Sequence, residues 1–362
     1  MIRLRPAHPR LSRGSMKKLI TFLILSLFFV ACGQWKVTRY KGKKHAFIES
    51  GESQSQVMIK ADDFGLEVLS MGVNICDGNI CYYDNILKRI QIMKPNGEMI
   101  MVVGSTKNIN TKKTQAVNFN FNIIGYLLVD DEGNIYVQNS LPNARQGVEI
   151  YSPSYITVFN KEGNLQYTLG QTGPPDTPFT HIENIDVDEK GRLFVVASSS
   201  ESWSVFRFAG KKRDFYINLG KLSFEEKEGE TVYPGRIENV RVFSNGEDVL
   251  ISVVYYHELR LKYKKIFQFS IKAGKIIKEL MTIPDPKNVF FNIIDDKYLY
   301  FWNLDENNVI IMKCTMSGSI IDNILLEIDN KNCYYSKILC DKSGKFYSYH
   351  VTKRGIEIFK WE

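Results

Sequence analysis

The sequence predicts an all-β fold in which one β-repeat recurs six times, and three observations lead to this prediction. Short apolar, β-branched and aromatic runs alternate with polar turns that contain glycine, which is the local pattern of β-hairpins. These runs are too short for helices, and almost no stretch shows the apolar period of an amphipathic helix. The hairpin turns also recur at a regular interval, so the hairpins belong to units of one kind.

The clearest copy of the repeat lies in residues 156–196. It contains a strand, a turn at Gly163, a strand ending at Gly170, a connection rich in glycine and proline, and a second hairpin with its turn at Gly191. Glycine suits such turns because it accepts positive φ without a steric penalty. Proline cannot donate to a strand ladder, so three prolines place the connection between two sheets: Pro174, Pro175 and Pro178.

This stretch resembles the NHL repeat, whose units follow the pattern I-x-V-F-x-x-x-G, then G-x-x-G, then G-x-I/L-Y/F-V. The resemblance implies a six-bladed β-propeller, and it extends over residues 55–362 at the level of the repeat pattern. It implies no activity, because propellers carry many functions. The matching residues are Ile156, Val158, Phe159, Gly163, Gly170, Gly173, Gly191, Leu193, Phe194 and Val195.

The repeats account for most of the chain. The inner hairpin turns follow one another at intervals of 55, 58, 55, 50 and 48 residues, and a β-rich run follows each turn. A second set of five turns lies further along the units. The six inner turns are Asp77-Gly78, Glu132-Gly133, Lys190-Gly191, Asn245-Gly246, Asp295-Asp296 and Ser343-Gly344.

There are six inner turns but only five turns of the second set, and this difference predicts how the ring closes. The sixth unit ends at Glu362 and leaves no chain for a fourth strand, whereas an unassigned apolar run, residues 55–60, precedes the first unit. We therefore predict that residues 55–60 complete the last blade and pair with residues 356–360, since closure protects the sheet edges. A six-unit parallel solenoid, which needs no such exchange, is the alternative.

Residues 16–32 predict a secretory signal that ends in a lipobox. Two lysines after Met16 precede an apolar run that is too short for a typical membrane-spanning helix. The ending Phe29-Val30-Ala31-Cys32 resembles a bacterial lipobox of the spirochaete or Bacteroidetes type, which implies cleavage before Cys32 and diacylation of its thiol. The alternative is an ordinary signal peptide with an incidental Cys32.

The predicted organisation is a signal peptide in residues 1–32, with its start at Met16, a flexible tether in residues 33–54 and a propeller in residues 55–362. The chain as a whole resembles uncharacterised bacterial lipoproteins with an NHL-like propeller. That resemblance implies a location in the cell envelope, anchored by lipid to a bacterial membrane and outside the cytoplasm. A basic cluster in the tether is either a contact for anionic lipid or a solvated linker: Lys36, Arg39, Lys41, Lys43 and Lys44.

The formal net charge of +7 does not predict nucleic-acid binding. Residues 1–32 carry six basic residues and no acidic residue, and the remaining chain carries 41 basic and 40 acidic residues. The basic character therefore belongs to the presequence, and we expect no nucleic-acid partner.

A repeated hexapeptide marks the candidate site. IENIDV at residues 182–187 and IENVRV at residues 237–242 each place glutamate eight residues ahead of a turn glycine. In a propeller these segments are expected at the mouth of the central channel, where they bind a polar ligand or a divalent metal, or make repeated blade-to-blade hydrogen bonds. The candidate ligand-binding residues are His181, Glu183, Asn184, Arg236, Glu238, Asn239 and Arg241.

The histidines and cysteines give weaker signals. His181, His257 and His350 belong to three different units and lack a short ligand spacing, which favours surface or packing roles over zinc. Cys76 and Cys81 flank the first turn and either pair across it or remain buried thiols.

The predicted function is a binding or scaffold module for a protein or an envelope component. The alternative is a metal-dependent envelope lyase or hydrolase with its site at the channel mouth. The sequence contains no nucleophile elbow, phosphate loop or nucleotide fingerprint, and no residue set has catalytic spacing, so binding is favoured over catalysis. A solute-binding role for a transporter is disfavoured, because those proteins have α/β lobes.

Overall fold

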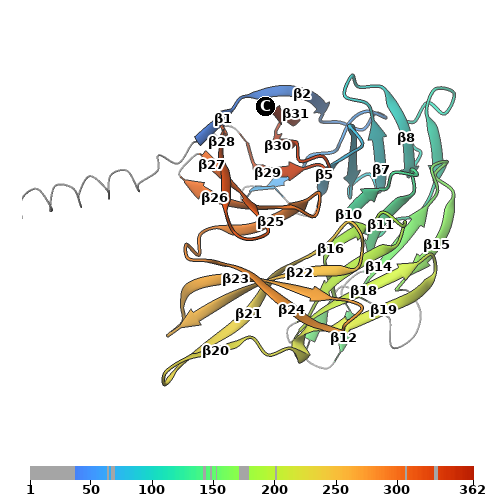
Figure 1. Ribbon diagram of the computed structural model, residues 1–362. Coiled ribbons are helices and arrows are strands. Elements are labelled where there is room, and N and C mark those ends of the chain that lie inside the picture. Colours follow the sequence, from blue (N-terminus) through green and yellow to red (C-terminus); the bar gives the residue numbers. More distant parts are fainter. Residues whose placement is uncertain are drawn as a thin grey trace, which may run out of the picture. The chain divides into compact units, whose positions relative to one another are not determined.

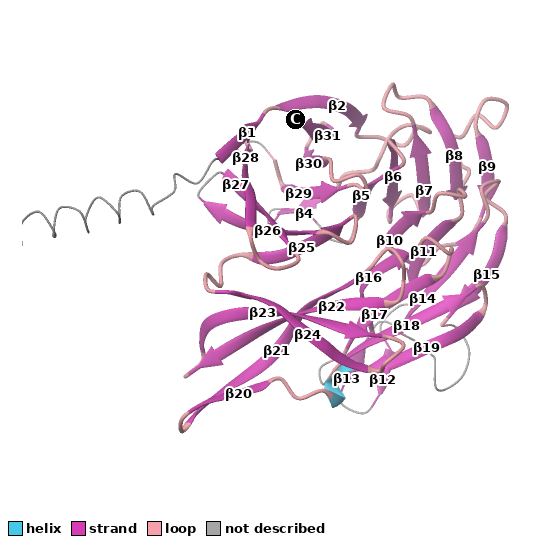
Figure 2. Cartoon of the chain, in the orientation of Figure 1, coloured by secondary structure: helices cyan, strands magenta, loops and turns pink. Residues whose placement is uncertain are grey.

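Six β-sheets, each formed by one repeat unit, are the blades of a β-propeller (Figure 1). Strands make up nearly all of the regular structure (Figure 2). By their contacts, residues 38–362 form one unit. The predicted all-β, six-bladed fold is therefore confirmed. The computed structural model describes residues 37–62, 65–66, 70–141, 144–146, 149–151, 153–170, 179–199, 202–305, 308–329 and 333–362.

The first strand of each blade lies innermost, because the first strands of neighbouring blades contact one another. From blade 1 to blade 6 they are β5 (Met71–Cys76), β10 (Ile123–Val129), β16 (His181–Val187), β21 (Thr231–Val242), β25 (Val289–Ile294) and β29 (Tyr335–Cys340). The second strands are β6 (Asn79–Asp84), β11 (Ile135–Ser140), β17 (Leu193–Ser198), β22 (Asp248–His257), β26 (Tyr298–Asp305) and β30 (Phe346–Thr352).

The outer half of each blade follows in the same antiparallel order. The third strands are β7 (Arg89–Met93), β14 (Ser154–Phe159), β18 (Trp203–Ala209), β23 (Arg260–Ser270), β27 (Asn308–Thr315) and β31 (Gly355–Trp361). The fourth strands are β8 (Met99–Gly104), β15 (Leu165–Leu169), β19 (Lys212–Asn218), β24 (Lys275–Ile283), β28 (Ile320–Glu327) and β2 (Gly42–Glu49).

A few short elements decorate this plan. Strand β9 adds to blade 1 in parallel with β8, β20 forms a hairpin with β21, and β1 lies beside β28. Two small hairpins and one 3₁₀ turn complete the described elements. Their bounds are β1 (Val37–Tyr40), β3 (Ala61–Asp62), β4 (Gly65–Leu66), β9 (Gln115–Asn118), β12 (Ala144–Gln146), β13 (Glu149–Tyr151), η1 (Leu219–Lys221) and β20 (Glu225–Glu228).

The hydrophobic core lies between the blades. Strand β17 shows why, since Leu193, Val195 and Ala197 pack with blade 2 whereas Phe194 and Val196 pack with blade 4. A strand that is covered on both faces needs apolar residues at successive positions. This explains the continuous apolar runs that follow the turns in the sequence.

Strand β2 closes the ring. It pairs antiparallel with β31, from Gly42 opposite Trp361 to Glu49 opposite Gly355, and Ile48 within it is fully buried. An N-terminal strand thus completes the last blade as predicted, and the solenoid alternative is wrong. The position differs, because residues 42–49 take the place that was predicted for residues 55–60.

The predicted tether is also corrected, because strands β1 and β2 occupy most of its residues. The segment was predicted as a tether because it is polar and rich in lysine. Strand β2 is the outer strand of its blade, so Lys43 and Lys44 face solvent and make the segment resemble a linker. Several of its basic side chains pair with acidic residues of the last two blades, at 2.7 Å for Lys43–Glu362 and 3.1 Å for Lys44–Glu357.

The segment predicted as the closing strand has another role. Val57 is fully buried and forms a single parallel bridge with Ser50. Arg89, which is almost fully buried, donates to the carbonyl oxygens of Ser53 (2.6 Å) and Gln56 (3.1 Å). Blade 1 therefore holds this segment by hydrogen bonds from a buried cation to its backbone.

We expect Arg89→Leu to destabilise the propeller by about 3 kcal/mol, because it removes the charge-assisted hydrogen bonds that a buried cation makes to the backbone of this segment. Urea denaturation gives the free energy of unfolding, and proteolysis should show earlier cleavage near Ser53. Arg39→Leu is the control, since Arg39 makes one exposed ion pair with Glu327. Equal losses in the two variants would contradict this role for Arg89.

Blade 4 is longer than its neighbours. Its first three strands have 12, 10 and 11 residues, and they project beyond the ring together with β20 (Figure 1). At the β22–β23 turn, Glu258 and Leu259 have positive φ, and Leu259 is 98% exposed. The projection carries a cluster of rings in which Tyr233 lies 5.5 Å from His257 and 6.1 Å from Tyr263.

Candidate functional site at the propeller axis

The repeated hexapeptide forms a repeated bulge. The pairing between the first and second strands shifts at one position in blades 2, 3, 4 and 5. Glu183 and Glu238 are the extra residues in blades 3 and 4, and Phe291 is the extra residue in blade 5. Because a bulge re-aims the side chains around it, this shift decides which groups reach the axis.

The two glutamates turn back onto their own blades. The hydroxyl of Ser198 donates to Glu183 at 2.6 Å. The ammonium of Lys264, which is almost fully buried, donates to Glu238 at 2.7 Å, and Ser252 donates to the same carboxylate. Both carboxylates are therefore engaged by side chains of the second and third strands.

The asparagines follow two patterns. Asn239 donates to the carbonyl oxygen of Phe290 in the next blade at 2.9 Å, and Asn74 makes the same kind of bond to Leu127 at 3.0 Å. Asn184 instead donates to Asp186 on its own strand at 2.6 Å. Asn239 thus makes the blade-to-blade hydrogen bond that was one of the two roles expected for the hexapeptides, whereas Asn184 orients the carboxylate of Asp186.

The two arginines of β21 lie in different surroundings. Arg236 is exposed and sits over the Tyr256 ring at 5.9 Å on the blade 4 projection. Arg241 donates through Nε to the carbonyl oxygen of Phe291 at 3.1 Å. Burial raises the pKa values of Tyr126 on blade 2 and Asp186 on blade 3, and the charge of Arg241 opposes that rise. Burial lowers the pKa of Lys337 on blade 6, and the charge of Arg241 lowers it further. The charge of Arg241 therefore acts on groups of three other blades.

Lys337 is a site residue that sequence reasoning missed. It lies four residues before Asp341, as Asn184 lies four residues before Asp188, so an alignment of the units on their turns would have found it. The pKa of Lys337 is lowered, first by burial among the surrounding strands and then by the charge of Arg241. The side chain of Lys337 is nevertheless exposed, so water reaches it.

Tyrosines from three blades lie beside these charges. The Tyr126 hydroxyl donates to the carbonyl oxygen of Glu183, and the Tyr335 ring lies 5.9 Å from that of Tyr349. Burial, followed by the effects of Tyr335 and Tyr126, raises the pKa of Tyr83 to about 12. Tyr126 and Tyr335 are each 37% exposed, so their rings are open to a ligand.

The histidines do not converge. His181 is exposed and its Nε2 atom lies 4.0 Å from Glu183, His257 packs on Tyr233 in the projection, and His350 is buried beside Ser348. Within the described ranges, no group of three or more histidine, cysteine, aspartate or glutamate side chains could hold a metal ion. Cys76 and Cys81 are buried, free thiols in hydrogen-bond contact.

His350 should make the protein less stable in mild acid. Burial lowers its pKa from 6.5, so the unfolded chain takes up a proton that the folded chain refuses. Stability is therefore expected to fall as pH decreases below 6.5 and to level off below the folded-state pKa. Burial also lowers the pKa of His45, so His45 should likewise reduce stability in mild acid. His350→Gln should reduce the slope of unfolding free energy against pH; a slope equal to that of the parent protein would contradict this assignment.

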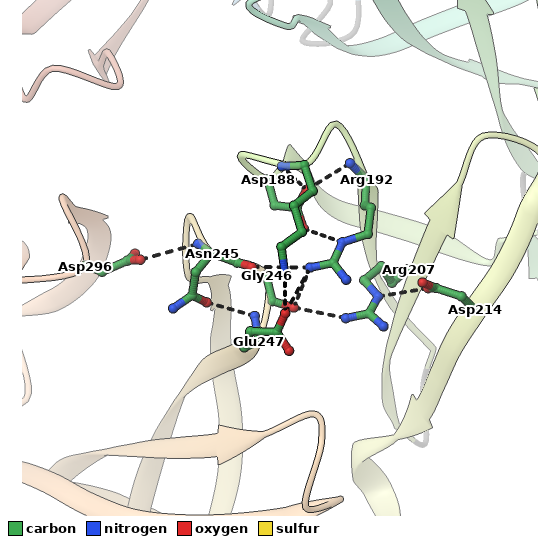
Figure 3. A network of polar contacts seen from close by, with 9 residues as sticks. Asp188, Arg192, Arg207, Asp214, Asn245, Gly246, Glu247 and Asp296 are labelled. Carbon is green, nitrogen blue, oxygen red and sulfur yellow. Dashed lines mark hydrogen bonds and ion pairs between the residues drawn. The ribbon is translucent and has the colours of Figure 1, made fainter.

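A polar network braces blades 3, 4 and 5 at the turns after the first strands, away from the bulges (Figure 3). Arg192 contacts Asp188 at 2.6 Å and donates to the carbonyl oxygens of Asn245 and Gly246. Arg207 donates to the same Gly246 oxygen at 3.0 Å. Two arginines of blade 3 thus hold one turn of blade 4, which keeps the inner strands in register.

Comparison with known proteins does not show a family for this chain. No family model matches the chain. The chain is 19% identical over 278 residues to "Maintenance of telomere capping protein 6" of Lachancea thermotolerans, a match that covers 73% of this chain and 50% of that protein. The chain therefore spans about half the length of this curated relative.

The solved structures that resemble this chain are also low in sequence identity. A Bacteroides caccae protein of unknown function is 14% identical with a TM-score of 0.41, over 72% of this chain and 84% of that one. The Dos1 propeller is 9% identical with a TM-score of 0.42, over 90% and 95%. An ulvan lyase is 9% identical with a TM-score of 0.41, over 88% and 95%. These likenesses carry no argument about activity, and the fold rests on the strand pairing described above.

Among the residues that the structure describes, no helix is long and apolar enough to cross a membrane. The signal segment and Cys32 lie outside these residues, so lipidation stays a prediction.

Proposed function

We propose that this protein is a lipid-anchored, extracytoplasmic propeller of the cell envelope that binds a protein or another envelope component at its axis. One observation carries the proposal. Tyr126 of blade 2 donates to the backbone of blade 3, Arg241 of blade 4 donates to the backbone of blade 5, and the charge of Arg241 acts on Tyr126, Asp186 and Lys337 of three other blades. Convergent polar groups at one place are the usual mark of a binding site, and a closed ring holds them in fixed positions.

Anchoring at Cys32 agrees with this role, because it would keep the binding face in the envelope. The alternative of a metal-dependent lyase or hydrolase gains no specific observation, since Glu183 and Glu238 are bonded to serine and lysine side chains.

Photo-crosslinking in the producing cells tests the binding role. The crosslinking residue p-benzoylphenylalanine replaces Tyr335 at the axis in one strain and Leu165 in another. Leu165 is the control because it is 50% exposed and lies on the fourth strand of blade 2. We expect one discrete adduct from position 335 and none from position 165. Identical adduct patterns, or no adduct from position 335, would refute an axial binding site.

A second experiment tests the anchor. Cells labelled with radioactive palmitate should yield a labelled protein, and Cys32→Ser should abolish the label and release the protein from membranes. A labelled Cys32→Ser protein would refute lipidation at this cysteine.

A further inference from the structure

Arg241 is held so that one edge of its guanidinium stays available. Its Nε donates to the carbonyl oxygen of Phe291 in the next blade, which fixes the plane of the group. Its two terminal amino groups have no hydrogen-bond or ion-pair partner among the described residues. A guanidinium in this state offers two parallel donors, the geometry that binds a carboxylate or a phosphate in a bidentate manner.

Lys337 supplies a second cation on the innermost strand of blade 6, two residues before the register position that matches Arg241. It occupies in β29 the register position that Asn239 occupies in β21, because each is followed by the turn four residues later. Within the described part of the chain, its ammonium makes no hydrogen bond and no ion pair. The charged form of an amine that has no partner, and on which the charge of Arg241 acts, is stabilised when an anion binds.

The acidic groups near this pair do not neutralise it directly. Asp186 acts on Arg241 through its charge but forms no ion pair with it, and it accepts the amide of Asn184 instead. Glu183 is occupied by Ser198. The further cation that acts on Asp186 is Lys342, which is itself paired with Asp131 at 2.9 Å.

We infer that Arg241 and Lys337 together bind an oxyanion, the carboxylate or phosphate group of the ligand, at the propeller axis. This inference rests on the proposed binding function and names the chemical class of its ligand. The exposed rings of Tyr126 and Tyr335 are placed to contact the uncharged part of that ligand.

Titration of the full chain with acetate and with inorganic phosphate tests the inference. Lysine side chains carrying ¹³C-methyl labels report on each ammonium by NMR, and Lys337→Arg assigns the Lys337 signal. At constant ionic strength set with chloride, we expect a saturable shift of this signal with at least one anion. The anion that saturates at the lower concentration identifies the group, carboxylate or phosphate.

Arg241→Gln should weaken this binding about tenfold or more, since it removes the charged donors. Arg236→Gln, an exposed arginine on the same strand, is the matched control and should leave the binding constant unchanged. Lys337→Gln, monitored by calorimetry, guards against misfolding of the first variant, because Lys337 makes no hydrogen bond and no ion pair among the described residues. The inference would be overturned if the Lys337 signal of the parent protein shifted linearly with anion concentration, without saturation. It would also be overturned if Arg241→Gln bound the anion as tightly as the parent protein.

The crosslinking experiment separates the two proposals. An adduct at position 335 that persists in the Arg241→Gln, Lys337→Gln double variant would leave the binding function standing and overturn the oxyanion assignment. Absence of the adduct in the parent protein would instead overturn the binding function.

Discussion

A chain that begins at residue 51 is expected to lose the cooperative unfolding transition of the propeller. Such a chain lacks β2, so β31 loses all of its fourth-strand pairing and the buried side chain of Ile48. The last blade would expose an unpaired edge, and the ring would lose the contact that joins its two ends. Thermal unfolding followed by circular dichroism and by calorimetry measures this effect.

A chain that begins at residue 33 is the control, because it retains β1 and β2. A chain starting at residue 51 that melts like this control would contradict closure by β2 and would restore the role predicted for residues 55–60.

Two single substitutions refine the test. Ile48→Ala should cost about 2–5 kcal/mol of unfolding free energy, because Ile48 is fully buried. Phe47→Ala, at the adjacent residue that is 37% exposed, should cost much less. The reverse order would place the wrong face of β2 against the core.

The second large effect is expected for Gly246→Ala, at about 3 kcal/mol or more of unfolding free energy. Gly246 has φ +65°, and an added Cβ would lie 2.0 Å from the Asp188 carboxylate and 2.6 Å from the Arg192 guanidinium. The side chain of Asp188 is fully buried, so it cannot move away without breaking its pair with Arg192. The substitution therefore disrupts the brace between blades 3 and 4.

Gly274→Ala separates this collision from backbone strain. Gly274 also has φ +65°, but an added Cβ there meets nothing within 4 Å. Its cost should be about 1–2 kcal/mol, the price of a left-handed alanine alone. Urea denaturation of both variants measures the difference, and equal costs would show that the Asp188–Arg192 pair yields to the new methyl group.

The candidate site shows where sequence reasoning reached its limit. The hexapeptides of blades 3 and 4 led to Arg241, whose charge acts on groups of three other blades. The same pattern also singled out Glu183 and Glu238, whose carboxylates turn back onto their own blades. Lys337 carries no hexapeptide, so only its register in β29 reveals its place. A bulge redirects side chains by one position, and alternation along a strand cannot show that shift.

The sequence by itself determined the strands, the hairpin turns and the number of blades, because these depend on local residue patterns. Glycines in the turns and apolar runs buried on both faces specify a blade without knowledge of its neighbours. Only the tertiary structure decided which N-terminal segment closes the ring and which side chains meet at the axis. The first outcome depends on partners more than three hundred residues apart, as for Gly42 and Trp361, and the second depends on bulges whose direction no single strand encodes.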